Sequence, residues 1–75
     1  MIKLLLLKTE QRQIQGKDYT HVALYEETTN QIFDFYRKTD EKAFNFVKNN
    51  KLGDDVTDKV CFVIKRNQKI SFDIK

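Results

Sequence analysis

The chain has 75 residues, of which 33% are charged and 12% aromatic, and its 14 lysines and arginines exceed its 11 acidic residues to give a net charge of +3. We expect one domain over residues 1–75, because a chain of this length buries too little surface for two cores. Two glycines and no proline exclude the glycine-rich loops of nucleotide-binding enzymes, and one cysteine and one histidine exclude an internal disulfide and a zinc site of three or four such ligands.

The first segment is apolar at its start and polar at its end. The run up to Leu7 is mostly leucine, the residues after it are mainly polar, and a turn follows around Gly16. No stripe with the 3.6-residue period of a helix continues past Leu7, so we predict one long strand over Ile2–Ile14. The apolar run is far shorter than the roughly 18 residues that a membrane span requires. We therefore expect a cytoplasmic protein without a membrane segment.

The clearest pattern in the sequence lies in two segments, Tyr19–Glu26 and Gln31–Lys38, in which apolar residues recur at every second position. This period is typical of strands with one buried face. A hairpin that turns at residues 27–30 joins the two segments and determines their register. Its predicted core face pairs Leu24 with Phe33 and Val22 with Phe35.

The other face of this hairpin is predicted to be aromatic and charged. Successive side chains of a strand point to opposite sides, so the core register also decides which residues share the second face. Three tyrosines and one histidine exceed what a face in contact with water requires, although tyrosines also cover β surfaces that bind nothing. The predicted pairs on this face are Tyr25 with Ile32, Ala23 with Asp34, His21 with Tyr36, and Tyr19 with Lys38.

After the hairpin, the spacing of the apolar residues changes from two to three and four. We predict a helix over Asp40–Lys51, with Thr39 as its N-cap and Gly53 as a left-handed cap at its end. A helix this short needs tertiary contacts to be stable. Its Phe44 and Val47 are therefore expected to pack on the sheet.

Two further segments, Lys59–Lys65 and Lys69–Lys75, are predicted to form a final hairpin. The first is apolar at all five inner positions, which is typical of a central strand covered on both faces and makes Cys61 a small core residue. The second alternates between apolar and polar residues, as a strand with one exposed face does. Its expected core residues are Ile70, Phe72 and Ile74, with Ser71 and Asp73 on the exposed side.

The predicted order is three strands, a helix and two strands. This order resembles that of the five-stranded OB-fold barrel, in which a helix between the third and fourth strands closes one end. It is similar to that of small single-stranded nucleic-acid-binding OB proteins of phages and mobile elements. The resemblance covers the whole chain and implies a mainly β (α+β) fold, a small OB-like barrel or a strongly curved antiparallel sheet. An open sheet with the helix across one face uses the same elements.

In OB proteins, single-stranded nucleic acid lies across the outer face of the second and third strands, where bases stack on aromatic rings and basic groups contact phosphates. The resemblance therefore implies a non-catalytic module that binds single-stranded DNA or RNA. Arg12 is expected beside His21 on the first strand, and the turn of the last hairpin is expected to flank the binding groove. The implied contacts are Tyr19, His21, Tyr25 and Tyr36 for the bases, and Arg12, Arg37, Lys38, Lys65, Arg66 and Lys69 for the phosphates.

The aromatic and charged face of the hairpin also suits a different class of function. Tyrosine, isoleucine and alanine with charged edges also suit a protein partner, so a small protein-interaction module, such as an inhibitor or accessory subunit, and a homodimer are alternatives. The only serine, Ser71, and Cys61 both lie in apolar strand patterns, which do not suit a nucleophile. Asp54, Asp55 and Asp58 match no calcium loop and favour a solvated turn. We expect no enzymatic activity, cofactor or bound metal.

Overall fold

The computed structural model of the chain describes residues 2–67 and 69–75. In these residues no helix is long and apolar enough to cross a membrane. The predicted order of five strands and one helix is confirmed. The elements are β1 (Leu4–Ile14), β2 (Lys17–Glu26), β3 (Gln31–Lys38), α1 (Glu41–Asn49), a short 3-10 helix (Thr57–Lys59), β4 (Val60–Ile64) and β5 (Ile70–Ile74).

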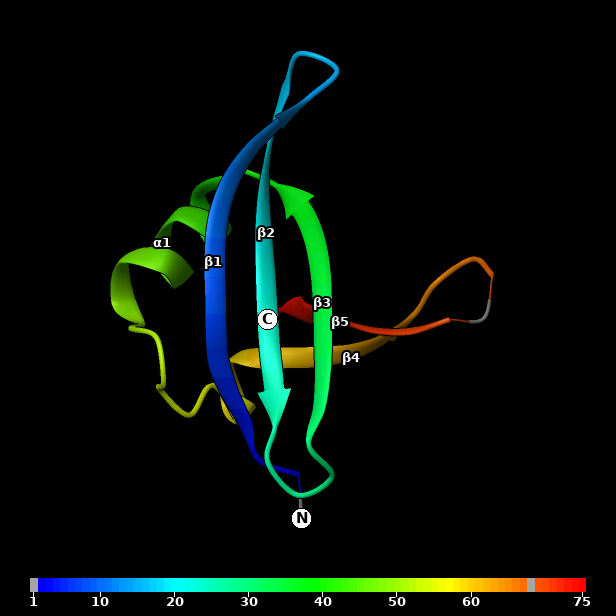
Figure 1. The fold of residues 1–75 in the computed structure, drawn as a ribbon. Coiled ribbons are helices and arrows are strands. Elements are labelled where there is room, and N and C mark those ends of the chain that lie inside the picture. Colours follow the sequence, from blue (N-terminus) through cyan, green and yellow to red (C-terminus); the bar gives the residue numbers. More distant parts are fainter. Residues whose placement is uncertain (1, 68) are drawn as a thin grey trace.

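The strands form two antiparallel sheets, one of β1, β2 and β3 and one of β4 and β5. No strand pairing within residues 2–67 and 69–75 joins the two sheets, so they form neither a closed five-stranded barrel nor one continuous sheet. The reason lies in the path of the last hairpin. β4 and β5 are five residues long and run across the direction of β2 and β3, so they cannot extend the hydrogen-bonded ladder of β3 (Figure 1).

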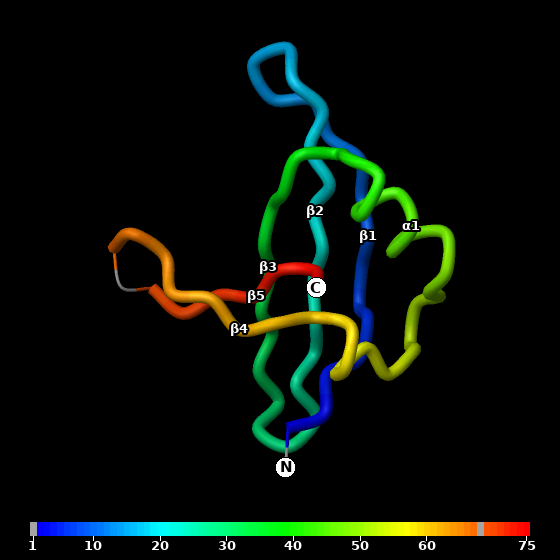
Figure 2. The backbone as a smooth tube through the Cα atoms, turned by 180° about the vertical axis from the view of Figure 1, so that it is seen from behind, coloured from blue at the N-terminus to red at the C-terminus, as the bar shows by residue number. Residues whose placement is uncertain are grey.

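The molecule has two layers (Figures 1 and 2). The three-stranded sheet forms one layer, and α1 and the β4–β5 hairpin lie behind it and form the other. The core between the layers consists of buried residues from both. From the sheet it takes Leu4, Leu6, Val22, Leu24 and Phe35, and from the second layer Ala43, Phe46, Val56, Val60, Phe72 and Ile74.

The register of β2 and β3 is the predicted one. Leu24 pairs with Phe33 and Val22 with Phe35. Val22 and Leu24 are completely buried, Phe35 is buried, and Phe33 packs against the core from a partly buried position. This confirms the predicted core face, and the period of two then places the aromatic and charged residues on the opposite face.

β1 changes from buried to exposed along its length, in line with its change from apolar to polar residues. Leu4 and Leu6 are buried, whereas the last four residues of the strand are exposed. A β-bulge between Leu6 and Lys8 shifts the register and leaves Leu7 exposed and without a pairing partner on β2. Beyond the bulge, Lys8 lies on the opposite face of the sheet from Leu6.

The connection between α1 and β4 covers the outer edge of β1 at its start. The backbone N–H of Leu6 donates to the carbonyl oxygen of Asp54 (2.8 Å), and the N–H of Gly53 donates to the carbonyl oxygen of Leu6 (2.7 Å). The same connection buries Val56 completely. Gly53 has a positive φ of 94°, but it lies in this connection, beyond the C-cap Asn50, so its predicted role as the helix cap is wrong.

The helix begins one residue later and ends two residues earlier than predicted. Its N-cap is Asp40, whose side-chain oxygen accepts a hydrogen bond from the N–H of Ala43 (2.9 Å). The hydroxyl of Thr39, the predicted cap, instead donates to the side chain of Gln11 (3.0 Å) and shares a hydrogen bond with the hydroxyl of Thr20 (2.9 Å). Tertiary contacts to β1 and β2 thus occupy Thr39 and leave the cap to the next residue.

The helix packs on the sheet through a different face from the predicted one. It buries Ala43 and Phe46 and leaves Phe44 60% exposed. Because each helical residue turns the side chain by about 100°, Phe44 points away from the sheet once Ala43 faces it. Val47 is half-buried. The prediction that Phe44 packs on the sheet is therefore wrong.

The prediction that the fourth strand is covered on both faces is also wrong. Val60 is buried at its start, but Phe62 is 56% and Ile64 70% exposed. β4 runs behind the sheet and then past the edge of β3, so no other described element covers its second half (Figure 1). Cys61, predicted to be a core residue, is half-buried.

In β5 the predicted inward positions are correct for Phe72 and Ile74, which are buried, and wrong for Ile70, which is 54% exposed. Ile70 lies at the outer end of the hairpin, where β5 has left the core. Ser71 is buried although it was predicted to point outward, because this part of β5 lies against β3.

Candidate functional site

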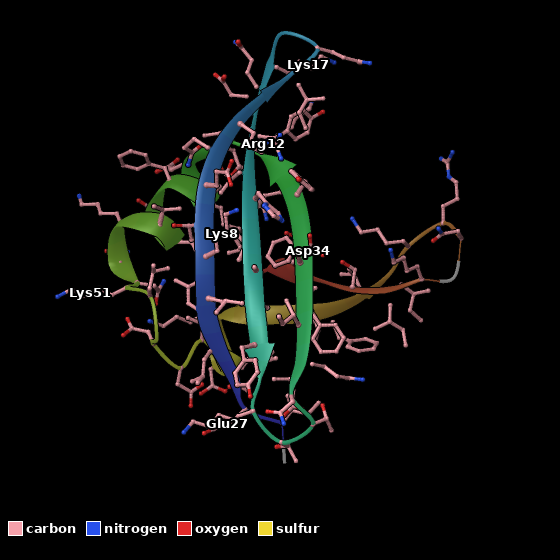
Figure 3. All side chains as sticks on the ribbon, in the orientation of Figure 1. Lys8, Arg12, Lys17, Glu27, Asp34 and Lys51 are labelled. Carbon is pink, nitrogen blue, oxygen red and sulfur yellow. The ribbon has the colours of Figure 1, made fainter. Side chains whose placement is uncertain are left out.

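The candidate site is the side of the three-stranded sheet that faces away from α1 and the β4–β5 hairpin, here called the front face. No described element covers it (Figures 1 and 2). Lys8 and Arg12 of β1 and Asp34 of β3 are labelled on it in Figure 3. By register its side chains are Leu5, Lys8, Glu10, Arg12 and Ile14 from β1, Lys17, Tyr19, His21, Ala23 and Tyr25 from β2, and Ile32, Asp34, Tyr36 and Lys38 from β3.

A stacked pair of rings lies on the front face near the middle of β2. The rings of His21 and Tyr36 are nearly parallel, with centroids 4.3 Å apart and an interplanar angle of 10°. Nε2 of His21 lies 2.9 Å from a carboxylate oxygen of Asp34, and Nη1 of Arg12 donates to the hydroxyl oxygen of Tyr36 (3.2 Å). The Tyr36 ring is thus held at one face and at its rim, while 39% of the residue stays exposed.

Glu10 is an acidic residue within this aromatic and basic surface. It accepts from Lys8 at 2.7 Å and lies 3.8 Å from Arg12. The hydrogen bond and charge of Lys8 hold the pKa of Glu10 below its usual value. Glu10 occupies the position opposite His21 that was expected for Arg12, and Arg12 lies opposite Tyr19 instead. The tight turn between β1 and β2 is the reason, because it pairs Ile14 with Lys17 and so places Arg12 opposite Tyr19.

The remaining tyrosines lie toward the two ends of the same face. Tyr19 and Tyr25 are both half-buried, and the hydroxyl of Tyr25 donates to the side-chain oxygen of Asn30 in the β2–β3 turn. Tyr25 follows Tyr19 by six positions of the strand, a length of about 20 Å. With His21 and Tyr36 between them, they form an aromatic row along the front face.

The turn of the last hairpin lies close to this row. An open groove of about 570 Å³, here called the corner groove, runs between β3 and the outer end of the β4–β5 hairpin. It brings Tyr36 together with Lys65 and Lys69, which follow it in the sequence by about thirty positions. Its lining residues are Ile32, Phe33, Asp34, Phe35, Tyr36, Lys65, Asn67, Lys69, Ile70 and Ser71.

Arg37, one of the predicted phosphate contacts, lies on the opposite side of the sheet. Its guanidinium donates to Asp73 (2.8 Å) and to Asp40 (2.7 Å), and so connects β3 to β5 and to the start of α1. Burial acts to lower the pKa of Arg37, but the hydrogen bonds and charges of Asp40 and Asp73 outweigh it and raise that pKa. Asp73, predicted to point outward, is half-buried by this contact. Arg37 therefore has a structural role and is not part of the front face.

Of the other predicted basic residues, Lys38 is exposed at the end of β3 and Arg66 is exposed in the β4–β5 turn. No pattern in the sequence predicts the corner groove itself. It depends on the hairpin crossing behind the sheet and emerging beside β3, and no local pattern specifies this path. Ile70, expected in the core, is one of the groove residues that sequence reasoning missed.

The acidic residues of the chain form no metal site among the residues that the structure describes. In the described part of the chain, no group of three or more histidine, cysteine or acidic residues is arranged to hold a metal ion. Asp54 and Asp55 accept hydrogen bonds from the backbone N–H groups of Lys51 and Thr57, respectively, as residues of an exposed turn do.

Comparisons of this chain with models of protein families, with curated proteins and with solved structures find no match.

Proposed function

We propose that this chain is a non-catalytic module that binds single-stranded DNA or RNA on the front face and in the corner groove. The observation that carries the proposal is the position of Tyr36. Its partly exposed ring, stacked on His21, lies between Arg12 and the corner-groove residues Lys65 and Lys69. Aromatic rings that stack bases, combined with cations that follow the phosphates, are the general means of binding single strands without sequence preference.

Tyr36 provides the stacking surface. A base placed on the ring would extend the existing stack with His21, and each base–aromatic stack contributes about 1 to 3 kcal/mol. The contacts of Tyr36 with His21 and Arg12 already orient the ring before a ligand binds. Less side-chain freedom is then lost on binding, which favours affinity.

The charges on this surface also support a polyanionic ligand. Lys38, Lys65, Arg66 and Lys69 form no ion pair with any described residue, so their charges are available to phosphates. The two acidic residues of the front face, Glu10 and Asp34, are each bound to a basic or ionisable neighbour. Their repulsion of a phosphate is reduced by these contacts.

Titration of a fluorescein-labelled oligo(dT) by fluorescence anisotropy tests the proposal. At low salt we expect binding at micromolar protein, and the affinity should fall as salt rises because phosphate contacts release counterions. Tyr36→Ala should weaken binding by roughly 5- to 150-fold, which corresponds to the loss of one stack of about 1 to 3 kcal/mol. Tyr36→Phe keeps the ring and should bind almost as the wild type does.

The matched control is Phe44→Ala, which removes an exposed aromatic ring from α1, behind the sheet. This variant should bind oligo(dT) as the wild type does. No binding at micromolar protein in low salt would contradict the proposal. So would equal losses of affinity in Phe44→Ala and Tyr36→Ala.

One observation favours a protein ligand as a second candidate. The corner groove also contains the exposed apolar side chains of Ile32 and Ile70, which an extended peptide could cover. Salt separates the two functions, because apolar contacts persist at salt concentrations that weaken phosphate contacts. A ligand that remains bound at high salt would favour the protein-interaction module.

A further inference from the structure

The outer half of the β4–β5 hairpin is apolar, and no described element covers it. Ile64 and Ile70 pair with each other next to the turn, and both are more than half exposed, as is Phe62. Contiguous exposed apolar side chains are rare on monomeric proteins and mark surfaces that bind another molecule. The base of the hairpin is fixed in the core by Val60 and Ile74, so the outer half is presented beside the body of the molecule (Figure 1).

The same end of the hairpin is strongly basic. Lys65, Arg66 and Lys69 lie in or beside its turn, and none of them has an ion-pair partner among the residues that the structure describes. Two such tips would repel each other, so symmetric tip-to-tip pairing is disfavoured. The complementary surface has to be acidic and partly apolar.

The chain itself carries such a surface. An open groove of about 690 Å³, here called the acidic groove, lies where the start of β1, the β2–β3 turn and the 3-10 helix meet. This volume falls in the range of about 300 to 1,000 Å³ that is typical of binding pockets. Figure 3 labels Glu27 at this end, away from the hairpin tip. The lining residues are Ile2, Lys3, Glu27, Thr28, Asp55, Thr57 and Asp58.

The acidic groove matches the tip in both charge and apolar character. It has three carboxylates and one lysine, and that lysine, Lys3, is already paired with Glu27 at 3.4 Å. Asp58 is exposed and has no ion-pair partner among the described residues. Ile2 is exposed beside these groups and offers an apolar contact for Ile64 or Ile70.

We propose that the hairpin tip of one copy of this chain docks in the acidic groove of a second copy. The two surfaces lie on different sides of the molecule, so the contact is head-to-tail and leaves one free tip and one free groove. Contacts of this kind form rings or open chains, not closed two-fold dimers. A hairpin tip offers less than the roughly 800 Å² per partner of a standard interface, so the association is weak and depends on concentration.

Sedimentation velocity of the full chain without nucleic acid tests this proposal, so the result does not depend on the proposed function. Between roughly 10 and 500 µM protein, a range suited to weak interfaces, the average mass should rise with concentration at low salt and fall toward the monomer at high salt. A monomer at all these concentrations would overturn the proposal.

Two variants identify the surfaces. The tip variant combines Ile64→Asn with Arg66→Gln, and the groove variant is Asp58→Lys; all three positions are exposed, so both variants should fold, which thermal melts would verify. Each variant alone should remain monomeric. An equimolar mixture should form a one-to-one pair and nothing larger, because the intact tip of one variant meets the intact groove of the other.

Other results would assign the tip to a different partner. Self-association that persists in Asp58→Lys but is lost in the tip variant would mean that the tip binds elsewhere on the chain. Binding of the wild type, but not of the tip variant, to phosphatidylserine vesicles while the protein stays monomeric would assign the tip to an anionic membrane surface. Either result overturns the head-to-tail contact.

Discussion

The β2–β3 hairpin and the β4–β5 hairpin have the same kind of strand pairing and different surroundings. Both consist of two strands with apolar residues joined by a short polar turn, and both pair antiparallel without a shift in register. The apolar face of the first lies against the second layer, whereas the second is covered only near its base. An apolar strand pattern thus specifies pairing and leaves open how much of the strand another layer covers.

The turns of the two hairpins also differ, in the hydrogen bonds that hold them. In the first, the Glu26 carboxylate accepts hydrogen bonds from the backbone N–H groups of Thr28 (2.9 Å) and Thr29 (2.8 Å). In the second, the side chain of Asn67 accepts from the N–H of Lys69 at 3.1 Å. The first turn is held by a charged acceptor, and hydrogen bonds to charged groups are the stronger kind.

The largest expected difference between the hairpins is in hydrogen exchange. Amides of the central strand β2, such as those of Val22 and Leu24, should exchange only when the whole domain unfolds, whereas the amide of Arg66 should open locally. For a domain with a stability of roughly 5 kcal/mol, protection should differ by about a thousandfold or more. Amide exchange followed by NMR measures both, and equal protection at the two sites would contradict the comparison.

The next largest effect is expected from truncating one apolar side chain in each hairpin. Leu24→Ala removes a completely buried side chain and should lower the free energy of unfolding by about 3 to 5 kcal/mol. Ile64→Ala removes an exposed side chain and should change it by less than about 0.5 kcal/mol. Urea denaturation followed by circular dichroism compares the two. A similar loss in Ile64→Ala at dilute protein would show that the outer hairpin is covered.

A smaller effect is expected from the first turn when the pH changes. The hydrogen bond from the Thr29 side chain is the main cause that lowers the pKa of Glu26 from 4.5 to about 2. Burial acts to raise this pKa, and hydrogen bonds from the backbone of Thr28 and Thr29 lower it further. A carboxyl with a lowered pKa in the folded state stabilises the fold above its unfolded pKa, and this contribution is lost as the pH falls toward 2. Glu26→Gln should therefore melt below the wild type at pH 6, with the difference shrinking between pH 4.5 and 2. A difference that does not change over this range would mean that the Glu26 charge does not hold the turn.

The contrast between the hairpins also explains which parts of the fold were predictable. The alternation of Val22 and Leu24 with tyrosine and histidine determines a register, because a slip of one residue would expose the apolar side chains. Five successive apolar residues in β4 contain no such alternation. They suit a strand covered on both faces as well as a strand that leaves the core, and only the crossing of the second layer decides between them.

The helix and the site show a second limit of prediction. Thr39 and Asp40 are both good N-caps, and Phe44 and Phe46 are both suitable core residues, so the choice within each pair depends on contacts with distant residues. Thr39 bonds to Gln11 of β1 and to Thr20 of β2, which leaves the cap to Asp40. The front face was predictable because it follows from local register, whereas the corner groove requires two segments that are remote in sequence.

The β-bulge at Leu7 keeps the charged residues of β1 on the front face. In a strand without the bulge, Lys8, Glu10 and Arg12 would continue on the side of Leu4 and Leu6, which is the core. Deletion of Leu7 would instead remove the extra residue itself, so Lys8 would follow Leu6 directly and stay opposite Ala23 on the front face. Substitution and deletion of Leu7 should therefore both leave the charges of β1 on the front face, because no residue of β2 pairs with Leu7.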